Sequence, residues 1–215
     1  MVRKNYLPKF PDSYKGEFAK EYNNQKWMER NQKKTTLRCI EYLYDNNLGK
    51  NNIDENFPYL ILDMGCGTGY SSEVLIDNGF RVIGIDVLPD MLLKANERKN
   101  VRMLDNLDLI LADINYLPLR KRSIDHIISV SAYNFIIYGL EGTREERKVV
   151  NNTAKFLRGI LKGKGRAIIE FYPQNESELD LFSSSFKDNG FDGYIIKNNP
   201  KQKAGQTFLL LKKEG

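Results

Sequence analysis

The sequence predicts an open, doubly wound α/β sheet that is mostly parallel and has seven strands, the last of them antiparallel. Apolar runs of strand length alternate with helical patterns along most of the chain, which is the order of a parallel sheet covered by helices. A glycine-rich turn at residues 65–69 joins the first apolar run directly to a helical pattern. The loop between the last two apolar runs is too short for a parallel crossover, so the final strand should be antiparallel to its neighbour.

The segment before the sheet is predicted to be helical. Between residues 17 and 46, aromatic and aliphatic side chains recur at helical spacing, which indicates one or two amphipathic helices. Residues 1–15 contain two prolines and little periodicity, and they are predicted to form an irregular arm. We therefore divide the chain into an N-terminal region, residues 1–57, and a sheet domain, residues 58–215, which form one structural unit.

Each predicted strand is a short apolar run, and the first is continuously apolar, as a strand buried on both faces requires. The predicted strands are residues 59–63, 81–86, 107–112, 124–130, 166–171, 194–197 and 206–211. Helical spacing predicts helices at residues 70–78, 88–98, 143–161 and 177–189. Gly163 and Gly165 are expected to end the third of these helices before the fifth strand begins.

Composition excludes several classes of function. The 215 residues include one histidine and two cysteines without a Cys-x-x-Cys pair, so neither a metal site nor a redox dithiol is expected. No apolar run is long enough to span a membrane and no secretory signal is recognisable, so we expect a cytoplasmic protein. The net charge of +5 suits a polyanionic partner, although an ordinary soluble surface explains it equally well.

Acidic residues close three successive predicted strands, namely Asp63, Asp86 and Asp113. Ligands of such sheets bind beyond the carboxyl ends of the strands, so three carboxylates at this edge indicate a ligand site rather than unrelated loop acids. Asp86 follows Gly69 at about the spacing at which an acid binds ribose hydroxyls. The glycine turn offers backbone N–H groups and a helix N-terminus to the same ligand.

The residues around the turn narrow the choice of ligand. The order D-M-G-C-G-T-G at residues 63–69 resembles the first motif of the class I S-adenosylmethionine (SAM)-dependent methyltransferases, which have a Rossmann-like sheet. An acid inside the motif suits the cationic end of SAM, whereas it would repel a pyrophosphate. The resemblance implies SAM as the cofactor and a helical lid formed by the N-terminal region. It also implies a cofactor site formed by Tyr22, Arg30, Asp63, Gly65, Gly67, Gly69, Asp86, Val87, Met91, Asp113, Ile114 and Ser129.

Individual roles follow from this resemblance. Asp86 is expected to hold the ribose, and Asp113 with Ile114 to frame the adenine. Arg30 is expected to meet the methionine carboxylate from the lid, and a solvated surface charge is the alternative. Leu88 and Met91 are expected to pack on the adenine face, and a place in the hydrophobic core is the alternative.

Two further segments indicate a planar substrate. Residues 128–135 lie at the end of the fourth predicted strand and residues 170–175 at the end of the fifth, and each segment places an aromatic residue beside an amide. An aromatic ring stacks on a nucleobase while an amide reads its edge. Aromatic residues of an ordinary core would produce the same pattern.

These segments, S-x-S-A at 129–132 and F-Y-P-x-N at 171–175, together with Q-K-K-T-T-L-R at 32–38 resemble the small-subunit ribosomal RNA guanine-7 methyltransferases, the bud-site-selection or Williams–Beuren-region family. The resemblance implies that Asn134, Tyr172 and Asn175 position a guanine. Tyr133 or Phe135 would stack on it, although this family has Gln-Trp where the chain has Asn134-Phe135. Nitrogen 7 of guanine has a free lone pair, so no general base is expected and catalysis proceeds by positioning.

The same resemblance implies two partners. The first is small-subunit rRNA, which basic clusters at residues 120–122, 162–166 and 197–203 would face. The second is a small zinc-binding activator protein that adds a strand beside the third predicted strand, whose apolar edge invites pairing. Two alternatives stay open, a small-molecule methyltransferase on the same sheet and a non-catalytic ribosome-assembly factor.

Overall fold

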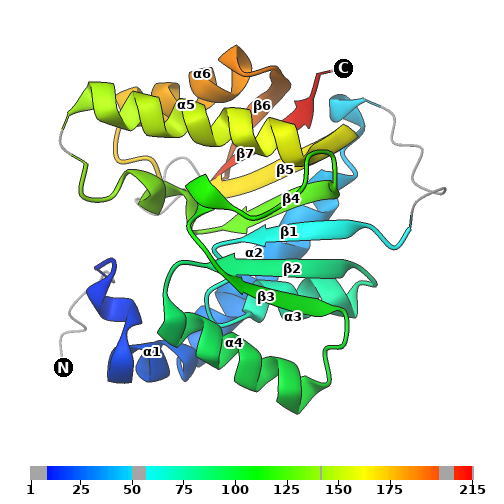
Figure 1. The fold of residues 1–215 in the computed structure, drawn as a ribbon, viewed down its shortest axis with the longest axis vertical. Helices are drawn as coiled ribbons and strands as arrows, with labels where there is room; N and C mark the ends of the chain where they lie inside the picture. Colours follow the sequence, from blue (N-terminus) through cyan, green and yellow to red (C-terminus); the bar gives the residue numbers. More distant parts are fainter. Residues whose placement is uncertain (1–8, 50–56, 141, 199–205, 215) are drawn as a thin grey trace.

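The structure, a computed structural model, describes residues 9–49, 57–140, 142–198 and 206–214. Part of the predicted N-terminal arm and part of the basic cluster at 197–203 lie outside these residues. Within them, seven strands form one sheet in the order β3-β2-β1-β4-β5-β7-β6, with helices on both faces (Figure 1). β7 is antiparallel to β5 and to β6, while the other pairs are parallel. The predicted fold class is confirmed.

The strands are β1 Leu60–Met64, β2 Arg81–Asp86, β3 Leu107–Leu111, β4 Ile124–Val130, β5 Leu161–Phe171, β6 Phe191–Asn198 and β7 Gln206–Lys213. The α-helices are α1 Gly16–Asn23, α2 Lys26–Leu43, α3 Tyr70–Asp77, α4 Pro89–Arg102, α5 Thr143–Ile160 and α6 Glu176–Asp188. Short 3-10 helices are η1 Asp12–Tyr14, η2 Asn46–Leu48, η3 Ile114–Tyr116 and η4 Tyr133–Ile137.

One boundary prediction is wrong. Gly163 and Gly165 do not end a helix, because α5 stops at Ile160 and β5 begins at Leu161 with no loop between them. Leu161 already pairs with Ile124 of β4, and a register irregularity lies between Ile124 and His126. Because Leu161 pairs with β4, strand β5 begins before the two glycines and includes them. From the sequence alone, the same glycines predict the end of a helix.

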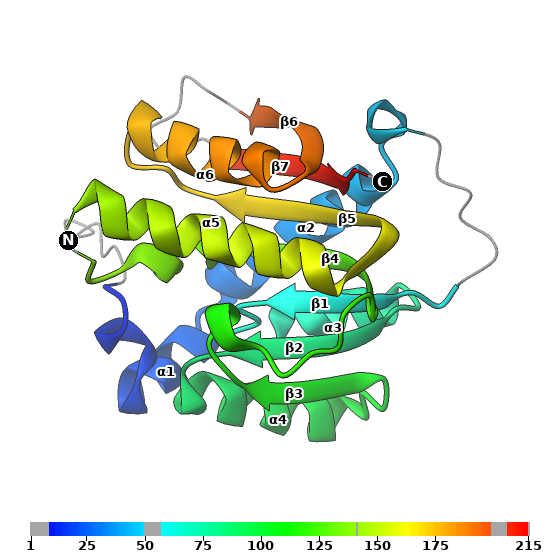
Figure 2. The same ribbon diagram turned by 45° about the horizontal axis from the view of Figure 1, so that its top comes forward.

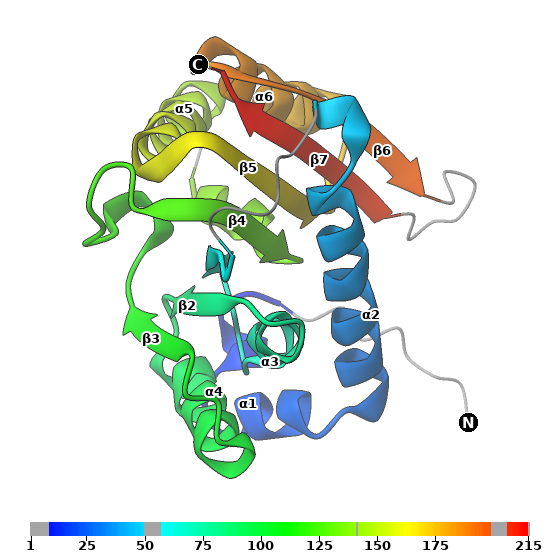
Figure 3. The same ribbon diagram turned by 90° about the vertical axis from the view of Figure 1, so that its right-hand side faces the viewer.

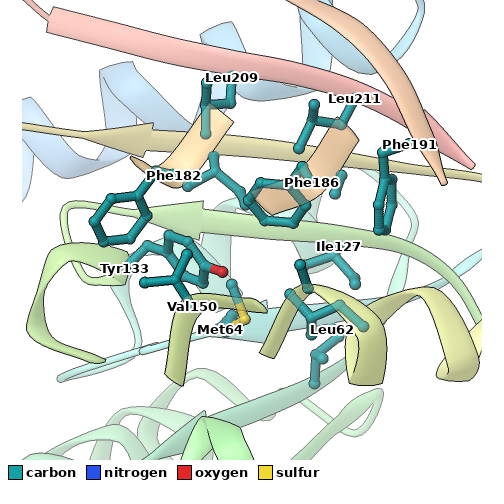
Figure 4. Close-up of a cluster of buried hydrophobic side chains, with 14 of the residues drawn as sticks. Leu62, Met64, Ile127, Tyr133, Val150, Phe182, Phe186, Phe191, Leu209 and Leu211 are labelled. Atoms are coloured by element: carbon teal, nitrogen blue, oxygen red, sulfur yellow. The ribbon is translucent and has the colours of Figure 1, made fainter. Parts of the chain in front are cut away.

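The alternation of side chains along β1 divides the core into two layers. Leu62 and Met64 face α5 and α6, where aromatic rings such as Phe182 fill the space between helices and sheet (Figure 4). Ile61 faces the opposite layer, which includes Cys39 of α2. Figure 3 shows α2 and α3 on this second face of the sheet and α5 and α6 on the first. Successive strand residues point to opposite faces, so Asp63 also points toward α3.

The N-terminal helices bring further residues to the carboxyl ends of the strands. α1 packs beside α4, and η1 lies beyond the strand ends on the same side of the molecule (Figures 1 and 2). None of the helices in the described part of the chain is long and apolar enough to cross a membrane.

Candidate active site

The glycine loop between β1 and α3 has the geometry that its sequence predicts. Gly65, Gly67 and Gly69 have φ values of 73°, 55° and 84°, in the left-handed region that side chains disfavour. A Cβ atom on Gly65 would lie 2.2 Å from the Cβ of Ala132, which follows β4. The close approach of two strand ends at this point therefore requires glycine. A hollow that Gly65 helps to line lies beside the loop.

Asp86, at the end of β2, lies beside this hollow. Its two carboxylate oxygens accept hydrogen bonds from the backbone N–H groups of Gly67 and Leu88, each at 2.9 Å. Burial raises the pKa of Asp86, and the two backbone donors oppose the rise. The carboxylate thus fixes the loop and keeps lone pairs for a ligand. A cavity of about 230 Å³ here is lined by Phe10, Gly65, Asp86, Val87, Asp113, Ile114, Asn115, Ala132, Phe135, Ile136 and Tyr138.

Asp63 lies behind the glycine loop, on the side of β1 that α3 covers. One of its oxygens accepts hydrogen bonds of 2.6 Å from the hydroxyl groups of Ser71 and Ser72, and the other has no hydrogen-bond partner. Burial raises the pKa of Asp63 to about 6 despite the two serine donors. Asp63 therefore holds the start of α3 against the end of β1. Its predicted role toward a cofactor stays a prediction.

The remaining predicted cofactor residues have different surroundings. Asp113 and Ile114 line the cavity, and Asp113 caps η3 by accepting from the N–H of Asn115 at 2.8 Å. Ser129 is buried and donates to the carbonyl of Met64, so it joins β4 to β1. Arg30 is exposed on α2.

Tyr22 and Met91 belong to a small buried cluster under the N-terminal segment. They pack with Ala19 and Leu88, which joins α1 to the start of α4. The Tyr22 hydroxyl accepts a hydrogen bond of 2.5 Å from Gln32, and the rings of Tyr14 and Tyr22 meet at 5.2 Å. Burial, followed by the charge of Asp86, raises the pKa of Tyr14 to about 12. The N-terminal segment thus reaches the neighbourhood of the Asp86 carboxylate.

Arg98 of α4 holds the glycine loop from outside, and no sequence pattern indicates this role. Its Nε donates to the Thr68 carbonyl at 3.0 Å, and its guanidinium lies 3.8 Å from the centre of the Tyr70 ring. It also pairs with buried Glu73 at 3.1 Å and donates to the Asn23 side chain at 3.0 Å. One side chain thus connects the loop, α3 and the end of α1. These partners are distant in sequence, so spacing could not reveal them.

The three residues predicted to position the substrate base lie together at the ends of β4 and β5, but their polar groups bind within the protein. The Asn134 side chain exchanges two hydrogen bonds of 2.9 Å with the backbone of Tyr172. The Tyr172 hydroxyl donates to the buried carboxylate of Glu170 at 2.6 Å, and burial together with that charge raises the pKa of Tyr172. Asn175 caps α6 by accepting from the N–H of Glu178. Whether they touch a base stays a prediction.

The two candidates for base stacking have unequal access. Tyr133 is fully buried in the core beneath α6, where it contacts Phe182. Phe135 is half-buried and lines the cavity. The structure therefore leaves Phe135 as the ring of this pair that faces the cavity.

The groups that commonly serve in covalent catalysis are buried in this protein. His126 is buried within β4, and burial lowers its pKa to about 4, so it is neutral near pH 7. Cys39 and Cys66 are buried, and burial raises the pKa of both thiols. Among the described residues no set of three acids, histidines or cysteines converges to hold a metal ion. The site can therefore bind and orient ligands, and it presents no activated nucleophile.

Comparison with known proteins agrees with this architecture. Residues 61–157 match the family described as a methyltransferase domain. The magnesium protoporphyrin IX methyltransferase of Synechocystis PCC 6803, solved with bound SAM, superimposes with a TM-score of 0.65 over 94% of each chain at 19% identity. The chain therefore has the sheet architecture of the class I methyltransferases, and residues 61–157 match a methyltransferase domain.

The sequence relatives are more specific. The 18S rRNA (guanine-N(7))-methyltransferase of Bos taurus is 30% identical over 193 residues, which is 89% of this chain and 64% of the bovine protein. The chain spans 52 to 64% of the length of the curated 18S rRNA guanine-N7 methyltransferases to which it is similar. A complex between the Haloferax volcanii Trm112 methyltransferase activator and a methyltransferase matches with a TM-score of 0.58 at 17% identity, over 91% of this chain and 97% of that one.

Proposed function

We propose that this chain is a SAM-dependent methyltransferase that methylates nitrogen 7 of a guanine in small-subunit rRNA. The observation that carries the proposal is the similarity to 18S rRNA guanine-N7 methyltransferases along 89% of the chain. That similarity includes the glycine loop and the substrate-side segments after β4 and β5.

The cavity above the glycine loop has features that suit SAM. Gly65 lines the cavity with backbone alone, and Asp86 offers carboxylate lone pairs to ribose hydroxyls. Val87 and Ile114 supply apolar walls for an adenine ring, with Asp113 beside them to accept from its amine. When bound, SAM supplies a methyl group on a sulfonium, which carries its own leaving group.

The remaining residues then have to present a guanine to that methyl group. Nitrogen 7 needs no deprotonation, which agrees with the neutral, buried state of His126 and of both thiols. Alignment of nucleophile, carbon and sulfur is the main contribution that the protein makes. We assign Phe135 to stacking on the base, and the Asn134–Tyr172 pair to shaping the wall beside it.

Mapping of small-subunit rRNA from a deletion strain tests this function. Mass mapping or primer extension should show the loss of one N7-methylguanine, and the wild-type gene should restore it. A gene carrying Asp86→Asn should not, since the substitution removes the carboxylate that fixes the loop. Complete rRNA methylation in the deletion strain would contradict the proposal, and a processing defect without a lost methyl group would favour a non-catalytic assembly factor.

We further propose that a small zinc-binding activator protein adds a strand to β3. β3 is an edge strand that pairs only with β2 in the described sheet. Its last residue, Leu111, is 57% exposed, and Met103 and Tyr116 just outside the strand are each 82% exposed. An unpaired edge with exposed apolar side chains favours strand addition. The Trm112 complex among the similar structures supports this choice of partner.

Matched substitutions at the two edges of the sheet test the partner proposal. Leu111→Asp on β3 should abolish copurification of a co-expressed activator, whereas Ile195→Asp on the opposite edge strand β6 should not. Purified alone, the chain should aggregate or self-associate. A monodisperse monomer that never binds the activator would contradict the proposal. The cytoplasm is the proposed location, which cell fractionation checks.

A further inference from the structure

One aromatic side chain in the cavity has no part in the function proposed above. Phe10 precedes η1 in the N-terminal segment, and its ring stacks on Phe135 with 4.5 Å between centroids and 16° between planes. The Tyr138 ring meets Phe10 edge-on at 5.1 Å. Phe10 thus fills an aromatic slot formed by Phe135 and Tyr138, and it lines the same cavity as Gly65 and Asp86.

The position of Phe10 has the geometry that a nucleobase would adopt. A planar base stacks on an aromatic ring at about the same separation as a second aromatic ring does. Since Phe10 and Phe135 are already 4.5 Å apart, no base fits between them. A base on this face of Phe135 and the Phe10 ring therefore exclude each other.

Phe10 belongs to a short hydrogen-bonded turn at residues 9–13. Hydrogen bonds from the Ser13 N–H to the Lys9 carbonyl and from the Lys9 N–H to the Ser13 hydroxyl close a turn over residues 9–13. This turn carries Phe10. The anchor lies after it, where Gly16 donates to Asp90 at 2.8 Å. Displacement of Phe10 therefore has to break its ring contacts with Phe135 and Tyr138.

We propose that Phe10 occupies the place of the substrate base on Phe135, and that binding of a planar purine displaces the turn at residues 9–13. The proposal rests on the proposed function in that it takes the substrate to be an unpaired guanine in RNA. It adds that the N-terminal segment closes the base subsite before RNA binds, and that Phe10 competes with the substrate rather than with the cofactor.

Binding without turnover tests the proposal independently of methylation. Calorimetry would measure the affinity of a short RNA with one unpaired guanine, and of guanosine 5′-monophosphate, for protein saturated with S-adenosylhomocysteine. Phe10→Ala should bind both ligands about two- to tenfold more tightly than wild type, because the ring pair no longer has to be broken. Phe135→Ala should bind both more weakly. Phe18→Ala, an exposed phenylalanine of α1, is the matched control and should change nothing.

Each other result would overturn the proposal. Weaker RNA binding by Phe10→Ala would make Phe10 part of the platform, and an unchanged affinity would make its position incidental. A changed affinity for SAM instead would make Phe10 a cofactor residue. If neither ligand binds even after Phe10 is removed, the base subsite does not exist. The two experiments can also disagree. If the binding changes are as expected but the deletion strain keeps its rRNA methylation, the proposed function is rejected and the base subsite is retained.

Discussion

The glycine-loop side and the β4–β5 side of the candidate site are held together in different ways. On the first side, ligand-facing positions belong to the backbone and to Asp86, whose carboxylate fixes Gly67 while lining the cavity. On the second side, the side-chain amides of Asn134 and Asn175 form hydrogen bonds with the backbone of neighbouring turns. The glycine motif therefore predicted the backbone geometry of the first side correctly. On the second side, side chains are expected to bind the ligand. Their hydrogen bonds within the protein determine which of their polar atoms remain available to it.

Gly65 provides the strongest test of the backbone side. Gly65→Ala places a Cβ 2.2 Å from the Ala132 Cβ at a φ of 73°, so the loop must shift. We expect a loss of SAM affinity of about a hundredfold or more, corresponding to roughly 3 kcal/mol. Calorimetric titration with SAM measures it. Gly163→Ala is the control, because a Cβ there meets nothing within 4 Å and the substitution should leave Kd unchanged. Unaltered binding by Gly65→Ala would remove the loop from the cofactor site.

Asn134 provides the corresponding test of the other side. Asn134→Ala removes two hydrogen bonds to the Tyr172 backbone, each worth about 1 kcal/mol. We expect methyl transfer to fall about tenfold while the Kd for SAM stays within about twofold. Asn189→Ala, which breaks an amide contact between α5 and α6, should leave both quantities unchanged. If Asn134→Ala transfers methyl groups as fast as wild type, Asn134 does not position the substrate.

Arg98 and Arg102 form a matched pair of arginines near the glycine loop, one more buried and one more exposed. Both pair with buried Glu73, but their side chains are 16% and 51% exposed. Arg98→Met also releases the Thr68 carbonyl, so we expect it to lower the free energy of unfolding by about 2 kcal/mol and to weaken SAM binding several-fold. Arg102→Met should cost less than about 1 kcal/mol and leave SAM affinity unchanged. Denaturant titration and calorimetry measure both. Equal effects would mean that Arg98 acts only through Glu73.

Asp63 and His126 should affect stability with opposite dependence on pH. The folded-state pKa of Asp63 is raised from 3.8 to about 6, so its contribution is present at low pH and is lost as pH rises through about 6. The folded-state pKa of His126 is lowered from 6.5 to about 4, so its contribution is present above 6.5 and is lost as pH falls. Between about pH 4 and 6 the two slopes largely cancel.

Single substitutions should expose each slope separately. Asp63→Asn should become more stable as pH rises from about 4 to 6, and His126→Gln should become less stable, with slopes of up to about 1.4 kcal/mol per pH unit. Urea titrations across this range check the prediction. If wild type and both variants share one slope, the two groups titrate in the folded protein as they do in the unfolded chain.

Local pattern predicted the sheet because strands buried on both faces have continuous apolar runs, and it predicted Asp86 because a motif of fixed spacing carries it. It could not predict Phe10 or Arg98. Phe10 meets Phe135, and Arg98 meets Asn23, across long separations in the chain that only the tertiary fold closes. The local pattern also wrongly predicted that Gly163 ends a helix. This residue lies in β5 because β5 pairs with β4, and such pairing between distant segments cannot be recognised from the local sequence.

Methyl transfer by the purified protein tests the central claim most directly. Protein, SAM labelled on its methyl group and unmodified small-subunit rRNA are combined, and the labelled nucleotide is identified by mass spectrometry. We expect the label on nitrogen 7 of one guanine. The Asp86→Asn variant should give no label, because it loses the carboxylate that accepts a hydrogen bond from the Gly67 N–H. If the protein needs the proposed activator, the labelling should appear when that partner is co-purified. Label on another atom, or no label with the activator present, would contradict the account.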